Sequence, residues 1–165
     1  MIIAGTGHRP PTLFKENPYS FANKSKLIDF IVDIIDNLES DGIFIERIIS
    51  GLAQGWDNCL AHAAIEVEIP LLAAMPFKGM EKNWPKAAQK DYEYILTNAE
   101  KIVLVSEGGY SNHKFFLRDK YMVDNCDLLL ALYSGISKSG TGITIEYAKT
   151  QNKVIKNYWE DWINV

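Results

Sequence analysis

Short apolar runs alternate with longer amphipathic runs along all 165 residues, and most of the short runs end in glycine, serine or threonine. A short apolar run bounded by such residues is typical of a buried strand, and a longer run with one apolar face is typical of a helix. Strands separated by helices pair in parallel through right-handed crossovers. The pattern therefore predicts an α/β fold: a Rossmann-like, doubly wound, mainly parallel sheet with helices on both faces, formed by residues 1–165 as a single domain.

The expected elements follow from this alternation. We expect strands at residues 1–4, 47–50, 71–75, 101–105, 128–133 and 154–158. We expect one helix between an N-cap at Asn23 and Gly42, and further helices at residues 57–67, 85–98, 115–125 and 143–151. Three prolines between residues 10 and 18 predict an irregular stretch after the first strand. The spacing does not give the order of the strands in the sheet.

The composition restricts the classes of partner. The formal net charge is −4 and the sequence pI is about 5.4, whereas proteins that bind a phosphate backbone usually carry a basic surface. This acidic balance of charge argues against nucleic acid as a partner. No apolar run is long enough to cross a bilayer and the N-terminus lacks a basic leader, so we expect a cytoplasmic protein without a membrane partner. Cys59 and Cys126 lie in apolar helical contexts and are expected to be buried free thiols.

Glycine-rich turns follow the expected strands at residues 5–10, 50–55, 106–109 and 134–142. The carboxyl ends of parallel strands meet at one edge of a sheet, where α/β proteins bind ligands. Glycine lets the backbone approach a ligand, and the helix that follows adds its positive N-terminal end, which suits phosphate. One such turn is a weak signal because turns need glycine anyway. Four together predict a site for phosphate or another anion.

Two side chains in the first turn suit that ligand. Arg9 has the fork of donors that clamps a phosphate, although an ordinary turn salt bridge is an equal alternative. His8 suits a hydrogen bond to a ribose hydroxyl or a role as an acid, and a histidine that only stabilises the turn is equally consistent. The histidines show no metal-ligand spacing with cysteine or carboxylate, so we expect neither a metal nor another cofactor.

Each aromatic residue beside the turns has two alternative roles. Trp56, Phe77 and Trp84 suit stacking on a base, or packing at the sheet edge.

Glu146, which follows the last glycine turn, suits bonding of ribose hydroxyls or polarising a glycosidic bond. Its alternative role is to compensate the helix dipole.

Several segments resemble the SLOG superfamily, which unites DprA/SMF proteins, LOG phosphoribohydrolases and YpsA-like proteins. Residues 50–57 (Ser-Gly-Leu-Ala-Gln-Gly-Trp-Asp) are similar to the S-G-L-A-x-G-[IV]-D signature of the DprA branch. Residues 6–10 (Thr-Gly-His-Arg-Pro) resemble the T-G-x-[RK]-P start of the YpsA-like branch, as do residues 83–84 and 140–148. The matches occur in family order, and the chain is identified as a member of this superfamily, closest to the YpsA-like branch.

The resemblance to LOG enzymes implies a chemistry. Arg118 and the residues after it match the segment R-K-x-x-M-x-x-x-x-D, with Asp119 in place of its lysine. In that family this arginine and a glutamate from P-G-G-x-G-T-x-x-E are implicated in cleaving the base from a nucleoside monophosphate. The resemblance thus implies catalytic roles for Arg118 and Glu146. The second motif is disrupted here by an insertion, and Ile143 stands where the family has threonine.

Three functions follow as alternatives. The first is binding, sensing or sequestering a nucleotide-derived ligand, such as an ADP-ribose, NAD-type or cyclic nucleotide signal. The second is a LOG-type N-glycosidase, and the third and weakest is DprA-like binding of single-stranded DNA. The resemblance also implies a homo-oligomer and a bacterial or phage defence setting. The expected ligand-binding residues are Gly5, Thr6, Gly7, His8, Arg9, Ser50, Gly51, Ala53, Gly55, Asp57, Trp84, Gly140, Thr141, Gly142 and Thr144.

Overall fold

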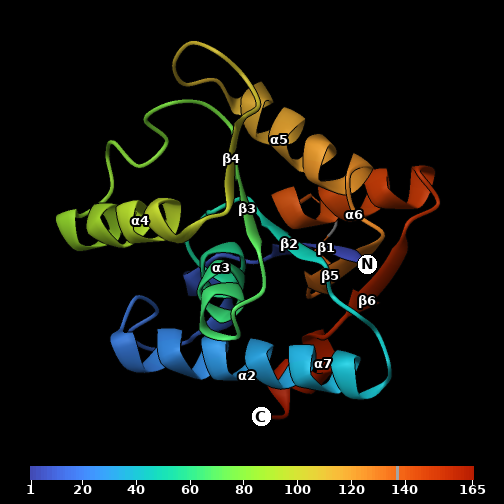
Figure 1. Ribbon diagram of the computed structural model, residues 1–165. Helices are drawn as coiled ribbons and strands as arrows, with labels where there is room; N and C mark the ends of the chain where they lie inside the picture. Colours follow the sequence, from blue (N-terminus) through green and yellow to red (C-terminus); the bar gives the residue numbers. More distant parts are fainter. Residues whose placement is uncertain (137) are drawn as a thin grey trace.

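The computed structural model describes residues 1–136 and 138–165 and holds six strands in one sheet with helices on both faces (Figure 1). All neighbouring strands are parallel, and their order is β4-β3-β2-β1-β5-β6. This confirms the predicted fold class and supplies the strand order. The strands are β1 (Ile2–Gly7), β2 (Arg47–Ser50), β3 (Leu71–Met75), β4 (Lys101–Leu104), β5 (Leu128–Leu132) and β6 (Val154–Asn157).

The helices form two layers. α2, α3, α4 and α7 cover one face of the sheet, and α5 and α6 cover the other (Figure 1). Among the described residues no helix has the length and apolar character needed to cross a membrane. The helices are α1 (Pro10–Leu13), α2 (Phe21–Ser40), α3 (Trp56–Glu66), α4 (Lys86–Asn98), α5 (Asn112–Asp124), α6 (Gly140–Thr150) and α7 (Trp159–Ile163).

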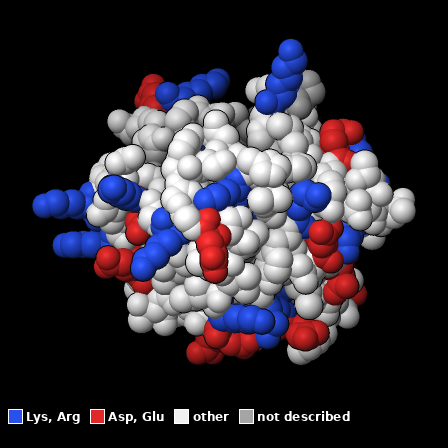
Figure 2. Space-filling view, turned by 90° about the horizontal axis from the view of Figure 1, so that it is seen from above, with Lys and Arg blue, Asp and Glu red and all other residues white. Residues whose placement is uncertain are grey.

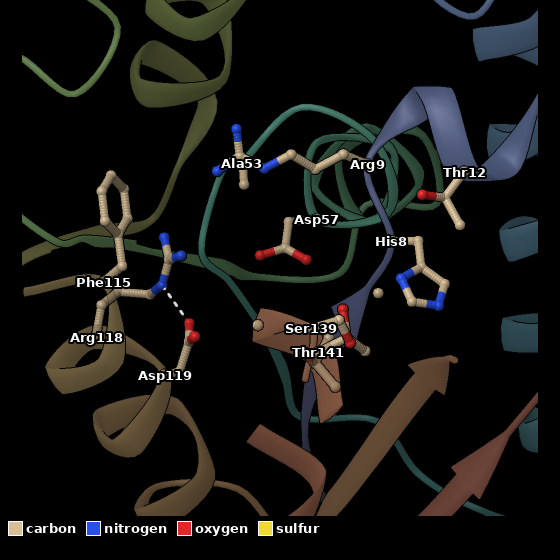
Figure 3. A pocket seen from close by; sticks show the side chains of 13 residues that line it. His8, Arg9, Thr12, Ala53, Asp57, Phe115, Arg118, Asp119, Ser139 and Thr141 are labelled. Carbon is tan, nitrogen blue, oxygen red and sulfur yellow. Dashed lines mark hydrogen bonds and ion pairs between the residues drawn. The ribbon is translucent and has the colours of Figure 1, made fainter. Parts of the chain in front are cut away.

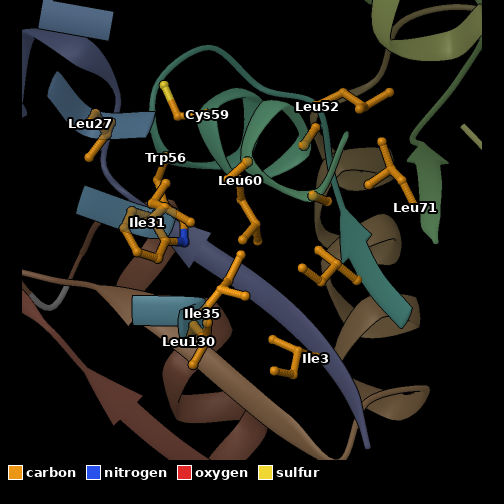
Figure 4. Close-up of a cluster of buried hydrophobic side chains, with 14 of the residues drawn as sticks. Ile3, Leu27, Ile31, Ile35, Leu52, Trp56, Cys59, Leu60, Leu71 and Leu130 are labelled. Carbon is orange, nitrogen blue, oxygen red and sulfur yellow. The ribbon is translucent and has the colours of Figure 1, made fainter. Parts of the chain in front are cut away.

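The two faces of the sheet carry separate cores because side chains alternate along each strand. Ile3 of β1 points into the larger core, beneath Trp56 and Leu60 of α3 (Figure 4). The next residue, Ala4, belongs to the smaller core and packs with Met122 of α5. The small side chain of Ala4 allows close approach of the helical layer on that face.

The two cysteines are free and buried, as predicted. Burial raises the pKa of the Cys59 thiol to about 12 and that of the Cys126 thiol to about 11. Both thiols therefore stay protonated at neutral pH and act as small apolar side chains in the core.

The chain connections diverge at the centre of the sheet. Strands β2, β3 and β4 lie on one side of β1, and β5 and β6 lie on the other. The loops that leave β1 and β5 therefore run in opposite directions. Such a switch point leaves a crevice at the carboxyl ends of the two strands, where open α/β sheets bind their ligands.

Two element boundaries near this crevice differ from expectation. β1 continues to Gly7 instead of ending near residue 4, because Gly5 and Gly7 pair with Leu130 and Leu132 of β5. α6 begins at Gly140 instead of near residue 143. The expected loop 134–142 is correspondingly shorter, and its residue 137 lies outside the described residues. The short helices α1 and α7 were not expected.

Candidate functional site

A pocket of about 340 Å³ opens at the switch point (Figure 3). Its walls come from the end of β1 and the segment after it, the turn after β2 with the start of α3, one face of α5 and the first turn of α6. The volume lies at the lower end of the range of about 300–1,000 Å³ found for small-molecule sites. The lining residues are Thr6, Gly7, His8, Arg9, Thr12, Ala53, Asp57, Phe115, Arg118, Asp119, Ser139, Gly140 and Thr141.

The N-terminus of α6 forms one wall of the pocket. Ser139 is the N-cap, and its Oγ accepts a hydrogen bond of 3.0 Å from the backbone N–H of Gly142. The N–H groups of Gly140 and Thr141 belong to the first turn, where a helix offers them no internal acceptor. These donors and the positive end of the helix dipole meet at the pocket, an arrangement that suits an anion.

Arg118 is buried, and three residues contact its guanidinium group. Its Nε donates to Oδ1 of Asp119 at 2.6 Å, its Nη1 donates to the carbonyl oxygen of Gly51, and its guanidinium carbon lies 5.9 Å from the ring centre of Phe115. The other carboxylate oxygen of Asp119 accepts from Thr144 Oγ1 at 3.1 Å. The orientation of the guanidinium is therefore set before any ligand arrives.

His8 joins the loops that leave β1 and β5. Its Nε2 accepts the backbone N–H of Ser134 at 2.9 Å, and the Ser134 hydroxyl lies 2.8 Å from the same nitrogen. A nitrogen that accepts from a backbone amide carries no proton, so the remaining ring proton is on Nδ1. Burial lowers the pKa of His8, which also favours the neutral ring. His8 is thus a neutral donor rather than a cation.

Asp57 lies in the first turn of α3 and is 8% exposed. Ser50 Oγ donates to its backbone oxygen at 2.6 Å, which fixes the turn after β2. A Cβ on Gly51 would stand 2.7 Å from Asp57 Oδ2 and 2.8 Å from the guanidinium carbon of Arg118. Glycine is needed there because the two side chains occupy the space that a larger residue would fill. Burial raises the pKa of Asp57 to about 7, against the opposing effect of Arg118.

This pKa makes stability depend on pH. Between the ordinary pKa of 3.8 and about 7, folded Asp57 holds a proton that the unfolded chain has released. We therefore expect the contribution of Asp57 to the free energy of unfolding to fall as pH rises through this interval, by at most about 1.4 kcal/mol per pH unit. Urea denaturation of the wild type and Asp57→Asn at about pH 5 and about pH 8 isolates this contribution. A stability difference that does not change with pH would contradict it.

The structure brings many of the expected ligand-binding residues together. Three others stand directly behind the lining: Gly51 contacts Arg118, Gly142 donates to the N-cap, and Thr144 donates to Asp119. The expected residues that line the pocket are Thr6, Gly7, His8, Arg9, Ala53, Asp57, Arg118, Gly140 and Thr141.

Two expected ligand-binding glycines have other roles. A Cβ on Gly5 would stand 2.3 Å from Leu60 Cδ2 and 2.9 Å from Trp56 Nε1, so this glycine makes room for α3. Gly55 has a φ of 104°, and a Cβ there would stand 2.6 Å from the carbonyl oxygen of His8. Neither glycine lines the pocket. Each is glycine because a side chain there would collide with its neighbours.

Three polar or aromatic residues also lie away from the pocket. Ser50 is fully buried beneath Asp57. Trp84 packs edge to face on Tyr92, with ring centres 5.6 Å apart, as part of the larger core. Glu146 is on the exposed side of α6, where it accepts a hydrogen bond of 2.7 Å from Lys149. The position of Glu146 gives no support to a catalytic role in this pocket.

Four lining residues were not expected to bind a ligand. Ser139 had a usable signal, since a serine just before a helix start is a common N-cap. In the sequence, Asp119 stands out only as a departure from the LOG motif. Thr12 and Phe115 carry no motif, and only the folding of α1 and α5 beside the strand ends places them in the pocket.

Comparison with known proteins identifies relatives along most of the chain. The family model described as the YspA SLOG family matches residues 3–164. The uncharacterized SPbeta prophage-derived protein YoqJ of Bacillus subtilis is 30% identical over 150 residues, which cover 81% of this chain and 84% of that protein.

Two solved structures share the fold. DprA from Streptococcus pneumoniae has a TM-score of 0.66 at 20% identity, over 94% of this chain and 49% of that one, so the chain spans about half its length. DprA from Helicobacter pylori has a TM-score of 0.63 at 18% identity, over 95% of this chain and 64% of that one. At these identities the likeness concerns the fold.

The expectation that argued against nucleic acid as a partner is wrong. The structure of DprA from Helicobacter pylori is described by its mode of binding single-stranded DNA, and that protein shares this fold. The expectation failed because net charge averages over the whole surface, whereas a ligand meets only the local charges of its site. Since the family model covers residues 3–164 and a relative is 30% identical over most of the chain, this protein belongs to the YspA SLOG family.

Proposed function

We propose that the pocket at the carboxyl ends of β1 and β5 binds a nucleotide through its phosphate group. The observation that supports this most is the convergence of the α6 N-terminus with Arg9 and Arg118 on one small cavity. Backbone donors at a helix start and arginine forks are the groups that bind phosphate oxygens in proteins. The neutral His8 adds a further donor without adding charge.

The remaining walls suit the rest of a nucleotide. Phe115 lines the cavity and packs edge to face against Phe77, with ring centres 5.3 Å apart. Its ring offers an apolar wall for a base, as aromatic side chains do in many nucleotide sites. The small volume suits one nucleotide unit. A protein of this kind would sense or sequester a nucleotide signal.

The N-glycosidase alternative lacks its expected carboxylate, since Glu146 is exposed and paired with Lys149. We therefore expect AMP to be recovered intact after prolonged incubation with the protein, as measured by chromatography. The appearance of free adenine would instead favour the glycosidase and would require another acid, with Asp57 and Asp119 in the pocket as candidates.

The Arg9→Gln variant tests the proposal. Arg9 is exposed at the pocket rim, so its loss leaves the core unchanged, while hydrogen bonds to a charged group contribute about 1.5–3 kcal/mol each. We expect affinity for a nucleoside monophosphate to fall by about 10- to 100-fold. Isothermal titration calorimetry with AMP, GMP, CMP, UMP and ADP-ribose measures the effect and identifies the preferred ligand.

Lys90→Gln is the matched control for this variant. It removes one positive charge from the exposed side of α4, outside the pocket lining. We expect its affinity to equal that of the wild type. If Arg9→Gln and Lys90→Gln bind these ligands with equal affinity, the proposed site is wrong. If none of these ligands binds to the wild type, the proposed function is wrong.

Binding of single-stranded DNA is a second candidate, favoured by the shared fold of DprA from Helicobacter pylori. On the face shown in Figure 2, lysine and arginine side chains are interspersed with acidic ones. We expect such a strand to place one backbone phosphate in the pocket, at the α6 N-terminus. Fluorescence anisotropy of a labelled oligothymidylate at about 50 mM and about 200 mM salt tests this. Binding that AMP displaces would place the strand in the pocket, and strand binding without AMP binding would replace the first proposal.

A further inference from the structure

Asp57 is a buried residue whose carboxyl group points into the pocket. The residue is 8% exposed and lines the cavity, and no hydrogen bond or ion pair joins its carboxylate to the residues that the structure describes. The other carboxylate of the pocket, Asp119, is bonded to both Arg118 and Thr144. Because its carboxyl group faces the pocket, Asp57 is placed to contact a bound ligand.

The surroundings of Asp57 decide what it can bind. In Figure 3 its carboxylate stands in the middle of the pocket, with Arg9, Arg118 and Thr141 around it. A phosphate held by the α6 N-terminus and Arg9 would lie against this carboxylate. Two anions in contact in a buried site repel each other strongly, and a shared proton removes the repulsion.

Resting on the proposed function, we propose that Asp57 is a recognition residue that contacts the phosphate of the ligand as a neutral carboxylic acid. The carboxyl O–H donates a hydrogen bond to a phosphate oxygen, and ligand binding is accompanied by uptake of one proton wherever free Asp57 is ionised. The pocket would accordingly prefer an anionic ligand group over a neutral one of the same shape, because an anion balances the charges of the two arginines and its oxygens accept from the carboxyl O–H.

The electrostatic balance of the pocket is consistent with this role. Burial, opposed by the positive charges of Arg118 and Arg9 and aided by the negative charge of Asp119, raises the pKa of Asp57 to about 7. The positive end of α3 also favours the ionised form. His8, which faces the same cavity, is neutral and adds no charge. The proton is therefore taken up with little cost near neutral pH.

Proton uptake can be counted directly on the unchanged protein. Titration calorimetry with AMP at about pH 8, in two buffers of different ionisation enthalpy, gives the number of protons bound. We expect close to one proton, and we expect the dissociation constant to rise by up to about tenfold per pH unit above pH 7. Over this interval the phosphate of AMP is already mostly ionised, since its second pKa is about 6.

Two variants test whether Asp57 is the group that takes up the proton. Asp57→Asn keeps the shape of the side chain without an ionisable group, and we expect it to bind AMP with no proton uptake and with an affinity that changes less than about threefold over the same pH range. Asp36→Asn, which makes the same change on the exposed side of α2, should retain the wild-type pH dependence.

The outcomes separate the two proposals. Binding of AMP by the wild type without proton uptake, or uptake that persists in Asp57→Asn, would overturn the role of Asp57 and leave the nucleotide site standing. No binding of AMP at about pH 6, where Asp57 is protonated, would instead count against the proposed nucleotide site itself. Because the proton count uses the wild type, a failure of Asp57→Asn to fold would not prevent the test.

Discussion

Replacing Trp56 with alanine is expected to lower the free energy of unfolding by about 3–5 kcal/mol. The indole is fully buried between α3 and β1, within the larger core (Figure 4). The strand beneath it cannot fill the resulting cavity, because Gly5 and Gly7 have no side chains and the Trp56 ring occupies the space where their Cβ atoms would stand. Chemical denaturation measures the loss, with the slope m as a check that both states keep their compactness.

Two further variants make this prediction specific. Gly7→Ala places a Cβ 2.5 Å from Cβ and Cγ of Trp56, so alone it should cost about 1–3 kcal/mol. In the Trp56→Ala background the contacts with Cγ and Cδ1 are gone and only the contact with Cβ of residue 56 remains, so the same change should cost less than in the wild type. Trp84→Ala, at a partly buried tryptophan, should cost less than Trp56→Ala. Additive effects of the Gly7 and Trp56 changes would show that the two residues do not share this space.

The fold could be predicted from the sequence because its strands are apolar runs between helices with clear apolar faces. β1 was predicted too short for a physical reason. Gly5, Thr6 and Gly7 read as a turn when taken alone, but their backbone groups pair with β5, which lies more than one hundred residues away. The order of the strands is not predictable for the same reason. Strands that pair lie far apart along the chain, and local spacing does not record their pairing.

The candidate site was predicted less completely, for two reasons. A glycine kept small for a ligand has the same sequence signature as one kept small for a neighbouring side chain, so the sequence does not distinguish these two roles for Gly5 and Gly55. The expected position of Glu146 near the pocket depends on a helix that begins close to residue 143. The Ser139 cap starts α6 earlier, so Glu146 lies beyond the first turn and pairs with Lys149 in solvent.

The Arg118→Met variant is expected to lose AMP binding and about 3 kcal/mol of stability. Methionine replaces most of the apolar length of the side chain but none of its donors. Asp119 then loses its ion pair of 2.6 Å, and the carbonyl oxygen of Gly51 loses its donor. Removing one member of a buried pair costs about 3–5 kcal/mol, and the lower value applies because the Asp119 side chain is 21% exposed.

The control for Arg118→Met is the other arginine–carboxylate pair of the described structure. Arg47 and Glu100 lie 2.5 Å apart, but their side chains are 30% and 48% exposed, so Arg47→Met should cost no more than about 1 kcal/mol. Adding Asp119→Asn to Arg118→Met should recover part of the lost stability, because the unpaired charge is removed, while AMP binding should stay weak. If instead the double variant were less stable than Arg118→Met, the cost would lie in lost packing against Phe115 rather than in the uncompensated carboxylate.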